Sequence, residues 1–158
     1  MIDDLHDEVE ARAKALAERH RERMVCRRGC FGCCVDDIFV FEVEATRIQK
    51  FAPELLASGT PHPPGRCAFL GSEGECRIYE VRPYVCRTQG LPLRWIDDEA
   101  KTEYRDICPL NDESPAIAVP VEELDPEECW TLGEFEERLA MLQGDGKRVR
   151  LRDLFNAG

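Results

Sequence analysis

The sequence has few histidines, no long apolar run and no excess of basic residues. Hydrolytic zinc sites commonly use His and carboxylate ligands, as in HExxH, and His6, His20 and His62 lack such spacing. No apolar stretch approaches the roughly 20 residues of a membrane helix. The net charge of -11 disfavours nucleic acid, because binding to phosphates depends on clustered Lys and Arg. We therefore expect no catalytic zinc, no membrane span and no nucleic-acid partner, and the sequence identifies no protein partner.

The first twenty residues, MIDDLHDEVEARAKALAERH, contain neither the basic n-region nor the apolar h-region of a secretory signal. This absence predicts a cytoplasmic protein, in which thiols stay reduced and stable disulfides are rare. The chain nevertheless has nine cysteines, and an odd number leaves one unpaired in an all-disulfide scheme. Metal ligation is the leading hypothesis for so many thiols.

Two amphipathic helices are predicted toward the ends of the chain. From Asp4 to Met24, mostly apolar residues recur every three or four positions. Near the end, Thr131 and Glu134 match a capping box, and the apolar face continues from Phe135. After that helix and a GDG turn, VRLRDLF is expected to be a strand or a docking tail.

Short elements are predicted between these helices. Residues 38–41 (IFVF) favour a strand, residues 42–51 a helix, and residues 53–58 (PELLAS) a short helix closed by Gly59. The proline-rich residues 60–65 (TPHPPG) predict a stiff, non-helical spacer. The middle of the chain is therefore expected to be irregular.

Two hairpins are expected after the spacer. In the first, CAFL, the turn GSEG and CRIYEVRP (residues 67–83) predict a short hairpin that runs into a turn or helical turn. The second is formed by residues 94–96 with 102–104. The fold class is predicted to be α-rich α+β, as one irregular domain with a cysteine-ligated metal centre and flanking helices. Its parts are an N-terminal helix (1–25), a cysteine-cluster core (26–110) and a C-terminal helical extension (111–158).

Four cysteines crowd into nine positions, CRRGCFGCC (residues 26–34). Thiolates are soft donors that suit Zn(II), Cu(I) and iron-sulfur clusters. Cys30 and Cys33 form a CxxC with Gly32 between them, which lets the loop turn around an ion. The adjacent side chains of Cys33 and Cys34 diverge, so they face two ions, or one ligates while the other packs. Two closed sites, one polynuclear cluster, and one four-ligand site with spare thiols all remain open.

Arginines accompany the cysteines along the chain, and their guanidinium groups can stabilise an anionic metal-thiolate centre. They are Arg27, Arg28, Arg66, Arg77, Arg82 and Arg87. The alternative is that they only solvate the surface. In IYEVRP, Tyr79, Arg82 and Pro83 are expected to be framework residues.

The order CRRGCFGCC, IFVFEVEATRI, CAFLGSEGECRIYEVRPYVCR and ICPL resembles the YkgJ-type CxxCxxCC cysteine-cluster family, described as a zinc- or iron-chelating domain. The resemblance covers about residues 26–110. It implies that the metal ligands are Cys26, Cys30, Cys33, Cys34, Cys67, Cys76, Cys86 and Cys108. Cys26 departs from the short form of the motif, because three residues rather than two separate it from the next cysteine. Cys129 falls outside the motif and is expected to be a buried or incidental thiol.

Three other classes of protein share part of this cysteine pattern. Cys26, Cys30 and Cys33 have the CxxxCxxC spacing of radical-SAM enzymes, but the strand-helix alternation of their barrel is missing. Cys30 and Cys33 could form a redox dithiol, although the surrounding thiols argue against it. A disulfide scaffold is disfavoured by the odd cysteine count and the missing signal.

The sequence favours a zinc- or iron-chelating protein whose metal is mainly structural. Zinc is preferred because the ligands are all sulfur and a closed site suits a structural role. The alternative is an iron-sulfur redox protein, or an accessory to an oxidoreductase or methyltransferase-type enzyme. No catalytic residues are identified, and carboxylate pairs such as Asp36 with Asp37 are expected to be solvated.

Overall fold

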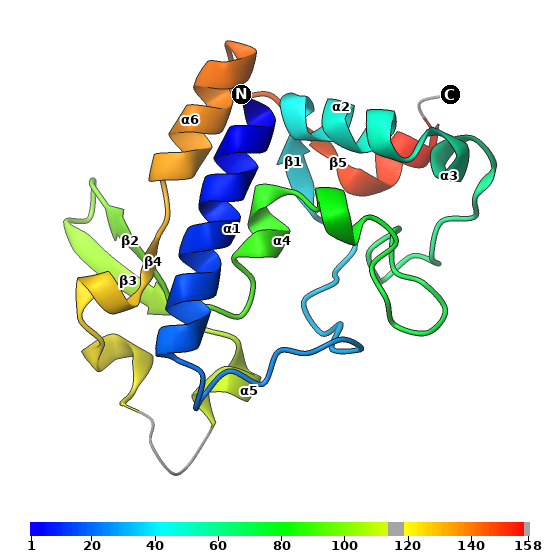
Figure 1. Ribbon diagram of the computed structural model, residues 1–158. Coiled ribbons are helices and arrows are strands. Elements are labelled where there is room, and N and C mark those ends of the chain that lie inside the picture. The colour runs from blue at the N-terminus through cyan, green and yellow to red at the C-terminus, as the bar shows by residue number, and fades with distance from the viewer. Residues whose placement is uncertain (114–118, 157–158) are drawn as a thin grey trace. The chain divides into compact units, whose positions relative to one another are not determined.

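The computed structural model describes residues 1–113 and 119–156 of the chain. It combines helices with small sheets, which confirms a mixed α+β class (Figure 1). The helices are α1 (Ile2–Arg19), α2 (Glu42–Phe51), α3 (Pro53–Ser58), α4 (Tyr84–Arg87), α5 (Pro109–Asp112) and α6 (Glu134–Gln143). The strands are β1 (Phe39–Phe41), β2 (Leu93–Asp97), β3 (Thr102–Asp106), β4 (Trp130–Thr131) and β5 (Arg148–Arg150). The 3-10 helices are η1 (Tyr79–Val81), η2 (Val121–Glu123), η3 (Pro126–Glu128) and η4 (Leu151–Asn156).

The chain divides into two compact units. Unit 1 comprises residues 1–2, 27–86 and 139–158, and unit 2 comprises residues 3–26 and 87–138. The organisation as a single domain stays a prediction. Among the described residues, no helix has the length and apolar character needed to cross a bilayer.

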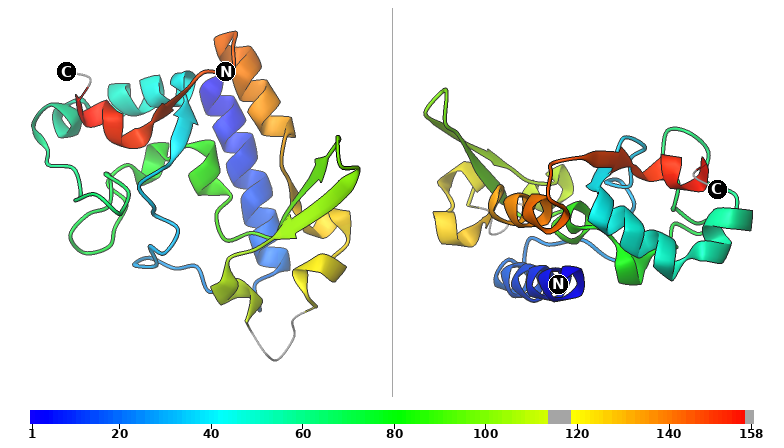
Figure 2. Two further views of the ribbon diagram at one scale, coloured as in Figure 1. Left: turned by 180° about the vertical axis from the view of Figure 1, so that it is seen from behind. Right: turned by 90° about the horizontal axis from the view of Figure 1, so that it is seen from above.

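Unit 1 is built on the antiparallel pair of β1 and β5, which Figure 2 shows side by side. Phe39 is 51% exposed, whereas Val40 and Phe41 are 1% and 4% exposed, so β1 is buried on both faces where it leads into α2. The chain passes directly from β1 into α2, where the Glu44 carboxylate accepts a hydrogen bond from the Phe41 N–H. The predicted strand and both predicted helices of residues 38–58 are thereby confirmed.

The core of unit 1 also receives cysteine side chains. Ile48 of α2, Phe69, Ile78 and Leu151 are buried together. Cys67 belongs to this core, and three further cysteines pack against it: Cys34, Cys76 and Cys86. The loops that carry these thiols are therefore attached to a packed apolar centre.

Unit 2 contains α1 and a three-stranded sheet in the order β3-β2-β4. The predicted hairpin of β2 and β3 is confirmed, and β4 adds to β2 in parallel. Helix α1 buries Leu5, Val9 and Ala13, and its Arg12 guanidinium lies 5.5 Å from the ring centre of Trp130. This stacking joins α1 to the strand at the sheet edge.

Both predicted end helices exist, but two of their boundaries were wrong. Helix α1 ends at Arg19 rather than Met24, because the buried Arg23 side chain donates to the Asn111 carbonyl from a turn after the helix. Helix α6 begins at Glu134, and the Gly133 N–H donates to Glu136 Oε2 at 2.8 Å. This contact replaces the expected capping box of Thr131, which lies in β4 instead.

The short hairpin expected in residues 67–83 has its strand pairing in a single antiparallel bridge between Leu70 and Cys76. The helical turn expected after it is confirmed as the 3-10 segment η1. After α6, VRLRDLF forms the strand β5 and then the 3-10 segment η4.

We expect Ile48→Ala to lower the free energy of unfolding of unit 1 by about 2–5 kcal/mol, the usual cost of a core cavity. Ile48 is 0% exposed. Native-state hydrogen exchange of unit 1 amides measures the loss. The matched control is Phe51→Ala on the same helix, because Phe51 is 51% exposed. Equal losses in both variants would contradict the assigned core.

Candidate metal centre

Five of the eight expected ligands are neighbours in unit 1. They are Cys33, Cys34, Cys67, Cys76 and Cys86. Cys34, Cys67, Cys76 and Cys86 are part of the unit 1 core or pack against it. Cys33 is exposed, and its negative charge contributes to the raised pKa of Cys86. The structure thus brings together thiols that are separated by up to 53 positions in the sequence, counted from Cys33 to Cys86.

Backbone hydrogen bonds place these cysteines. The Cys34 N–H donates to the Phe31 carbonyl, which folds the end of the CRRGCFGCC segment into a turn. The Cys67 N–H then donates to the Cys34 carbonyl at 2.9 Å, which joins the first cysteine segment directly to the second. The bridge between Leu70 and Cys76 returns the chain toward Cys67. Local turns and one long-range hydrogen bond therefore assemble the thiols.

The thiols affect each other electrostatically. The Cys34 thiol donates a hydrogen bond to Cys33, which lowers the pKa of Cys33 to about 6 and raises that of Cys34. Burial raises the pKa of Cys67 and of Cys76. At Cys86, burial and then the charges of neighbouring thiols raise the pKa. Without a cation, the group holds one stabilised thiolate, at Cys33, and keeps its buried members protonated.

The donor chemistry fits zinc or iron. All five neighbours are sulfur donors, which suit Zn(II) and iron-sulfur clusters, and a closed zinc site needs four of them. Across residues 1–113 and 119–156, no three His, Cys, Asp or Glu side chains are already arranged as a metal cage. Closing the group around a cation would require loss of thiol protons, so binding releases protons and depends on pH.

The other three expected ligands differ from this group. Cys30 is exposed in unit 1, within the turn that its N–H closes on the Arg27 carbonyl. Cys26 and Cys108 belong to unit 2. Asn111 Nδ2 lies 3.4 Å from Cys26 Sγ, while the Asn111 N–H donates to the Cys108 carbonyl at 2.8 Å.

Asn111 is a residue that the sequence patterns did not reveal. It is 0% exposed, its Oδ1 accepts from the Val25 N–H, and its Nδ2 donates to the Gly90 carbonyl. Through these contacts Asn111 fixes the segment that leads into Cys26. Only the ND dipeptide after ICPL marks this position in the sequence, as a turn-forming pair.

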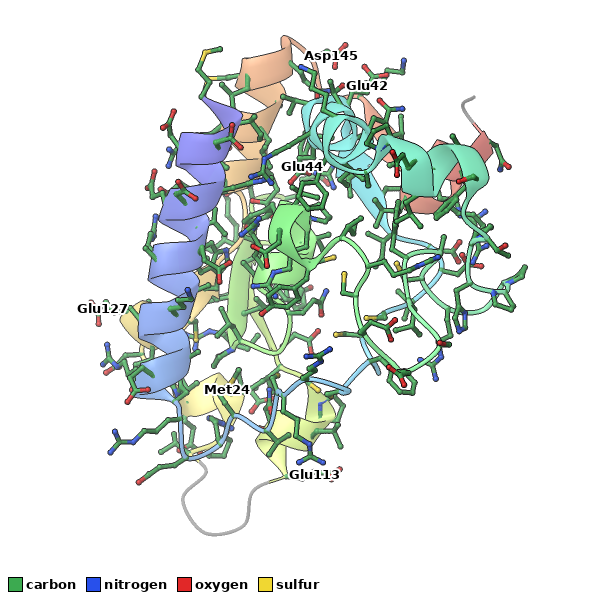
Figure 3. All side chains as sticks on the ribbon, turned by 45° about the vertical axis from the view of Figure 1, so that its right-hand side comes forward. Met24, Glu42, Glu44, Glu113, Glu127 and Asp145 are labelled. Atoms are coloured by element: carbon green, nitrogen blue, oxygen red, sulfur yellow. The ribbon has the colours of Figure 1, made fainter. Side chains whose placement is uncertain are left out.

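In unit 1, the buried carboxylate of Glu44 likewise fixes chain segments through hydrogen bonds to backbone N–H groups. It is 2% exposed and lies between α2 and α4 in Figure 3. Its Oε1 accepts from the Tyr84 N–H at 2.6 Å, and its Oε2 accepts from the Phe41 N–H. Glu44 therefore connects the start of α2 to the start of the helix that carries Cys86.

The expectation that Asp36 is solvated was wrong. Its side chain is 13% exposed and pairs with the Arg152 guanidinium at 2.5 Å. The pKa of the Asp36 carboxyl is lowered below its usual value, mainly by the hydrogen bond from the Gly65 N–H and next by that from Arg152. Asp37, by contrast, is 82% exposed, as expected.

The arginines flanking the cysteines have different partners. Arg77 and Arg82 lie near enough to Cys76 to oppose the rise of its pKa. Arg82 also stacks on the exposed Tyr79 ring at 4.0 Å, and Arg87 pairs with Glu10 in unit 2. A charge-stabilising role beside the thiols is thus supported by the positions of Arg77 and Arg82.

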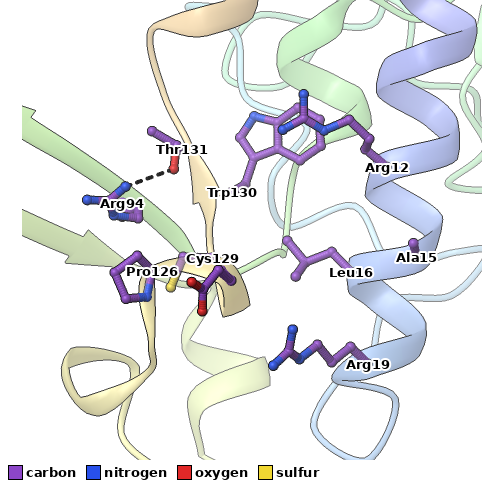
Figure 4. A pocket seen from close by; sticks show the side chains of 10 residues that line it. Arg12, Ala15, Leu16, Arg19, Arg94, Pro126, Cys129, Trp130 and Thr131 are labelled. Atoms are coloured by element: carbon purple, nitrogen blue, oxygen red, sulfur yellow. Dashed lines mark hydrogen bonds between the residues drawn. The ribbon is translucent and has the colours of Figure 1, made fainter.

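Cys129 is buried in unit 2, as expected for a thiol outside the motif. Its Sγ accepts a hydrogen bond from Arg105 at 3.2 Å. It lines a hollow of about 530 Å³ beside α1, shown in Figure 4. The arginines of this hollow already face carboxylates: Arg12 faces Glu134, Arg19 faces Glu128, and Arg94 faces Glu103.

We expect Cys33 to be the first thiol labelled by iodoacetamide in the metal-free protein. With a pKa of about 6, it is mainly thiolate at pH 7, whereas an ordinary thiol of pKa about 8.5 is not. Its labelling rate, followed by peptide mass spectrometry, should rise through pH 6. Cys34→Ala should move this rise toward pH 8.5, and Cys129→Ala should leave it in place. A rise centred near 8.5 in the unaltered protein would contradict the assigned hydrogen bond.

Asn111→Ala should destabilise unit 2. It leaves the Val25 N–H and the Gly90 carbonyl without their buried partner, at a cost of about 1–3 kcal/mol each. Urea unfolding followed by tryptophan fluorescence reports this unit, because Trp95 and Trp130 both lie in it. Leu110→Ala on the same helix is the control, since Leu110 is 53% exposed. The assignment fails if both variants unfold at the same urea concentration.

Comparison with known proteins agrees with the cysteine arrangement. Residues 25–109, just over half of the chain, match the CxxCxxCC family, whose description is "Putative zinc- or iron-chelating domain". The matched segment contains all eight expected ligands. The chain shows no significant match to a curated protein or to a solved structure. On the family match and the cysteine spacing together, the chain belongs to the CxxCxxCC family.

Proposed function

We propose that this protein binds zinc through thiolates of unit 1 and that the metal is mainly structural. The observation that carries the proposal is that Cys34, Cys67, Cys76 and Cys86 belong to or pack against a single apolar core, with Cys33 hydrogen-bonded to Cys34. Four thiolates close a structural zinc site. The fifth is a spare ligand or a packing thiol, in keeping with the diverging side chains of Cys33 and Cys34.

The position of the thiols supports a structural role for the metal. Between Ser58 and Tyr79 the chain has no helix or strand, and within this stretch its order depends on turns and the single bridge at Cys76. A metal that joins Cys67 and Cys76 to the CRRGCFGCC segment would therefore supply folding free energy to this stretch. A cytoplasmic setting suits the proposal, because reducing conditions keep the ligands as thiols.

An iron-sulfur centre is the competing occupant, since the same thiolates can hold one. The protein would then be a redox protein or an accessory to an enzyme. We favour zinc because four of the five donors belong to the core or pack against it, which suits a closed site without turnover.

Metal analysis and a visible spectrum of protein purified without oxygen separate the two. A zinc protein is expected to be colourless with near-stoichiometric zinc. A brown protein whose broad visible absorption bleaches with reductant would overturn the zinc assignment and favour an iron-sulfur centre. Folded protein that contains no metal and has all its cysteines oxidised would overturn metal binding altogether.

Cys67→Ser should reduce the bound metal per chain and speed the hydrogen exchange of residues 59–78, because it removes a ligand at the centre of the group. The matched control is Cys129→Ser, since Cys129 is also buried but belongs to unit 2. Metal content and peptide-level exchange are measured on both variants. Equal metal content in the two would remove Cys67 from the ligand set.

A further inference from the structure

Arg152 makes an unusual set of contacts for a residue outside the matched segment. It lies on η4, and its side chain is 14% exposed. Its Nε donates to Asp36 Oδ1 at 2.5 Å and its Nη1 to the His62 carbonyl at 2.8 Å. Its Nη2 donates to the carbonyls of Arg66 at 2.8 Å and Pro63 at 3.3 Å. One guanidinium group thus serves four acceptors.

These acceptors flank the two cysteine segments. Asp36 follows Cys34 by two positions, and Arg66 immediately precedes Cys67. The same two segments are joined by the hydrogen bond from the Cys67 N–H to the Cys34 carbonyl, and the Gly65 N–H donates to Asp36 Oδ2. Arg152 therefore completes a ring of contacts around the junction of the first and second cysteine segments.

The proline-rich spacer has few backbone donors of its own, because prolines at positions 61, 63 and 64 have no N–H. Arg152 supplies donors to three carbonyls in or beside it. A guanidinium has five donors in a fixed plane, and a lysine ammonium cannot reproduce this geometry. Three of the four acceptors of Arg152 are backbone carbonyls, which distinguishes it from an ordinary surface ion pair.

The position of Arg152 is itself fixed by the core. Leu151 and Leu154, on either side of it, are 2% and 6% exposed and belong to the unit 1 core. The Leu151 N–H donates to the Ile38 carbonyl at 2.9 Å, directly after β5 pairs with β1. Arg152 is thus held against the strand that follows the CRRGCFGCC segment.

We propose that Arg152 is a positioning residue of the metal centre, which holds the Cys34 and Cys67 segments in the register that lets both thiolates reach one ion. The inference rests on the proposed function. The guanidinium also lies near enough to Cys67 to act on its charge. Positive charge at this point favours an anionic metal-thiolate centre.

The test compares Arg152→Gln and Arg152→Lys with Lys147→Gln. Lys147 is a matched control because it lies in the same C-terminal region and pairs with Glu42, but is 64% exposed. Zinc affinity is measured by competition with a chelator. We expect Arg152→Gln to weaken zinc binding about 10–100-fold, as for other residues that support ligands. Arg152→Lys should restore part of this loss, and Lys147→Gln should match the unaltered protein.

Cobalt(II) substitution separates positioning from a general loss of stability. The sulfur-to-cobalt charge-transfer intensity per bound ion reports the thiolate ligands. A merely structural role would lower the folded fraction and leave the intensity per bound ion unchanged. Positioning predicts a lower or shifted band in Arg152→Lys at saturating cobalt, with unit 1 still folded.

Hydrogen exchange of the Gly65 and Cys67 amides in metal-free protein gives an independent measurement. We expect faster exchange in Arg152→Gln than in Lys147→Gln. The positioning role is overturned if the unaltered protein binds zinc and Arg152→Gln binds it equally well with an unchanged cobalt spectrum. If the unaltered protein binds neither zinc nor iron, the proposed function fails, and the positioning role of Arg152 at the metal fails with it. The exchange measurement then still decides whether Arg152 joins the two segments.

Discussion

The burial of thiols against the unit 1 core is the constraint on which the rest of the site depends. Cys34, Cys67, Cys76 and Cys86 contact the same apolar side chains that hold α2, β1 and η4 together. Removal of a thiol from water disfavours its charged form, so these groups stay protonated until a cation compensates the charge. Core packing and metal chemistry are therefore coupled, because the same side chains take part in both.

In unit 1, a small number of long-range contacts orders an irregular chain. The hydrogen bond between Cys67 and Cys34, the buried carboxylate of Glu44 and the guanidinium of Arg152 each join segments that have little regular structure. Buried polar groups of this kind contribute most when all their partners are satisfied. A centre that depends on such contacts is specified by geometry as well as by its ligands.

The sequence predicted the elements whose signals are local. The strand at residues 38–41, the helix that follows and the β2–β3 hairpin were all recognised from periodicity and turn residues. The end of α1 was missed because a buried arginine, Arg23, overrides helical periodicity there. The short hairpin and helical turn of residues 67–83 were recognised from the same kind of signal, and the pairing there is a single bridge because turns rather than a ladder order that stretch.

For the site, the cysteines could be identified as a group, but their supporting residues could not. Spacing and family resemblance indicate which thiols are candidates. The partners of Arg152 are separated from it by as many as 116 positions, and nothing in the local sequence marks such a contact. The division of the cysteines between the two units likewise depends on tertiary contacts.

The pairing of β1 with β5 has a consequence for biosynthesis. All eight expected ligands lie between residues 26 and 108, and β5 begins only at Arg148. During translation the cysteines therefore leave the ribosome before the strand that completes their core has been made. While about forty residues are added between Cys108 and Arg148, the thiols exist without the packing that buries them, at the stage when they are most open to cellular metal and to oxidants.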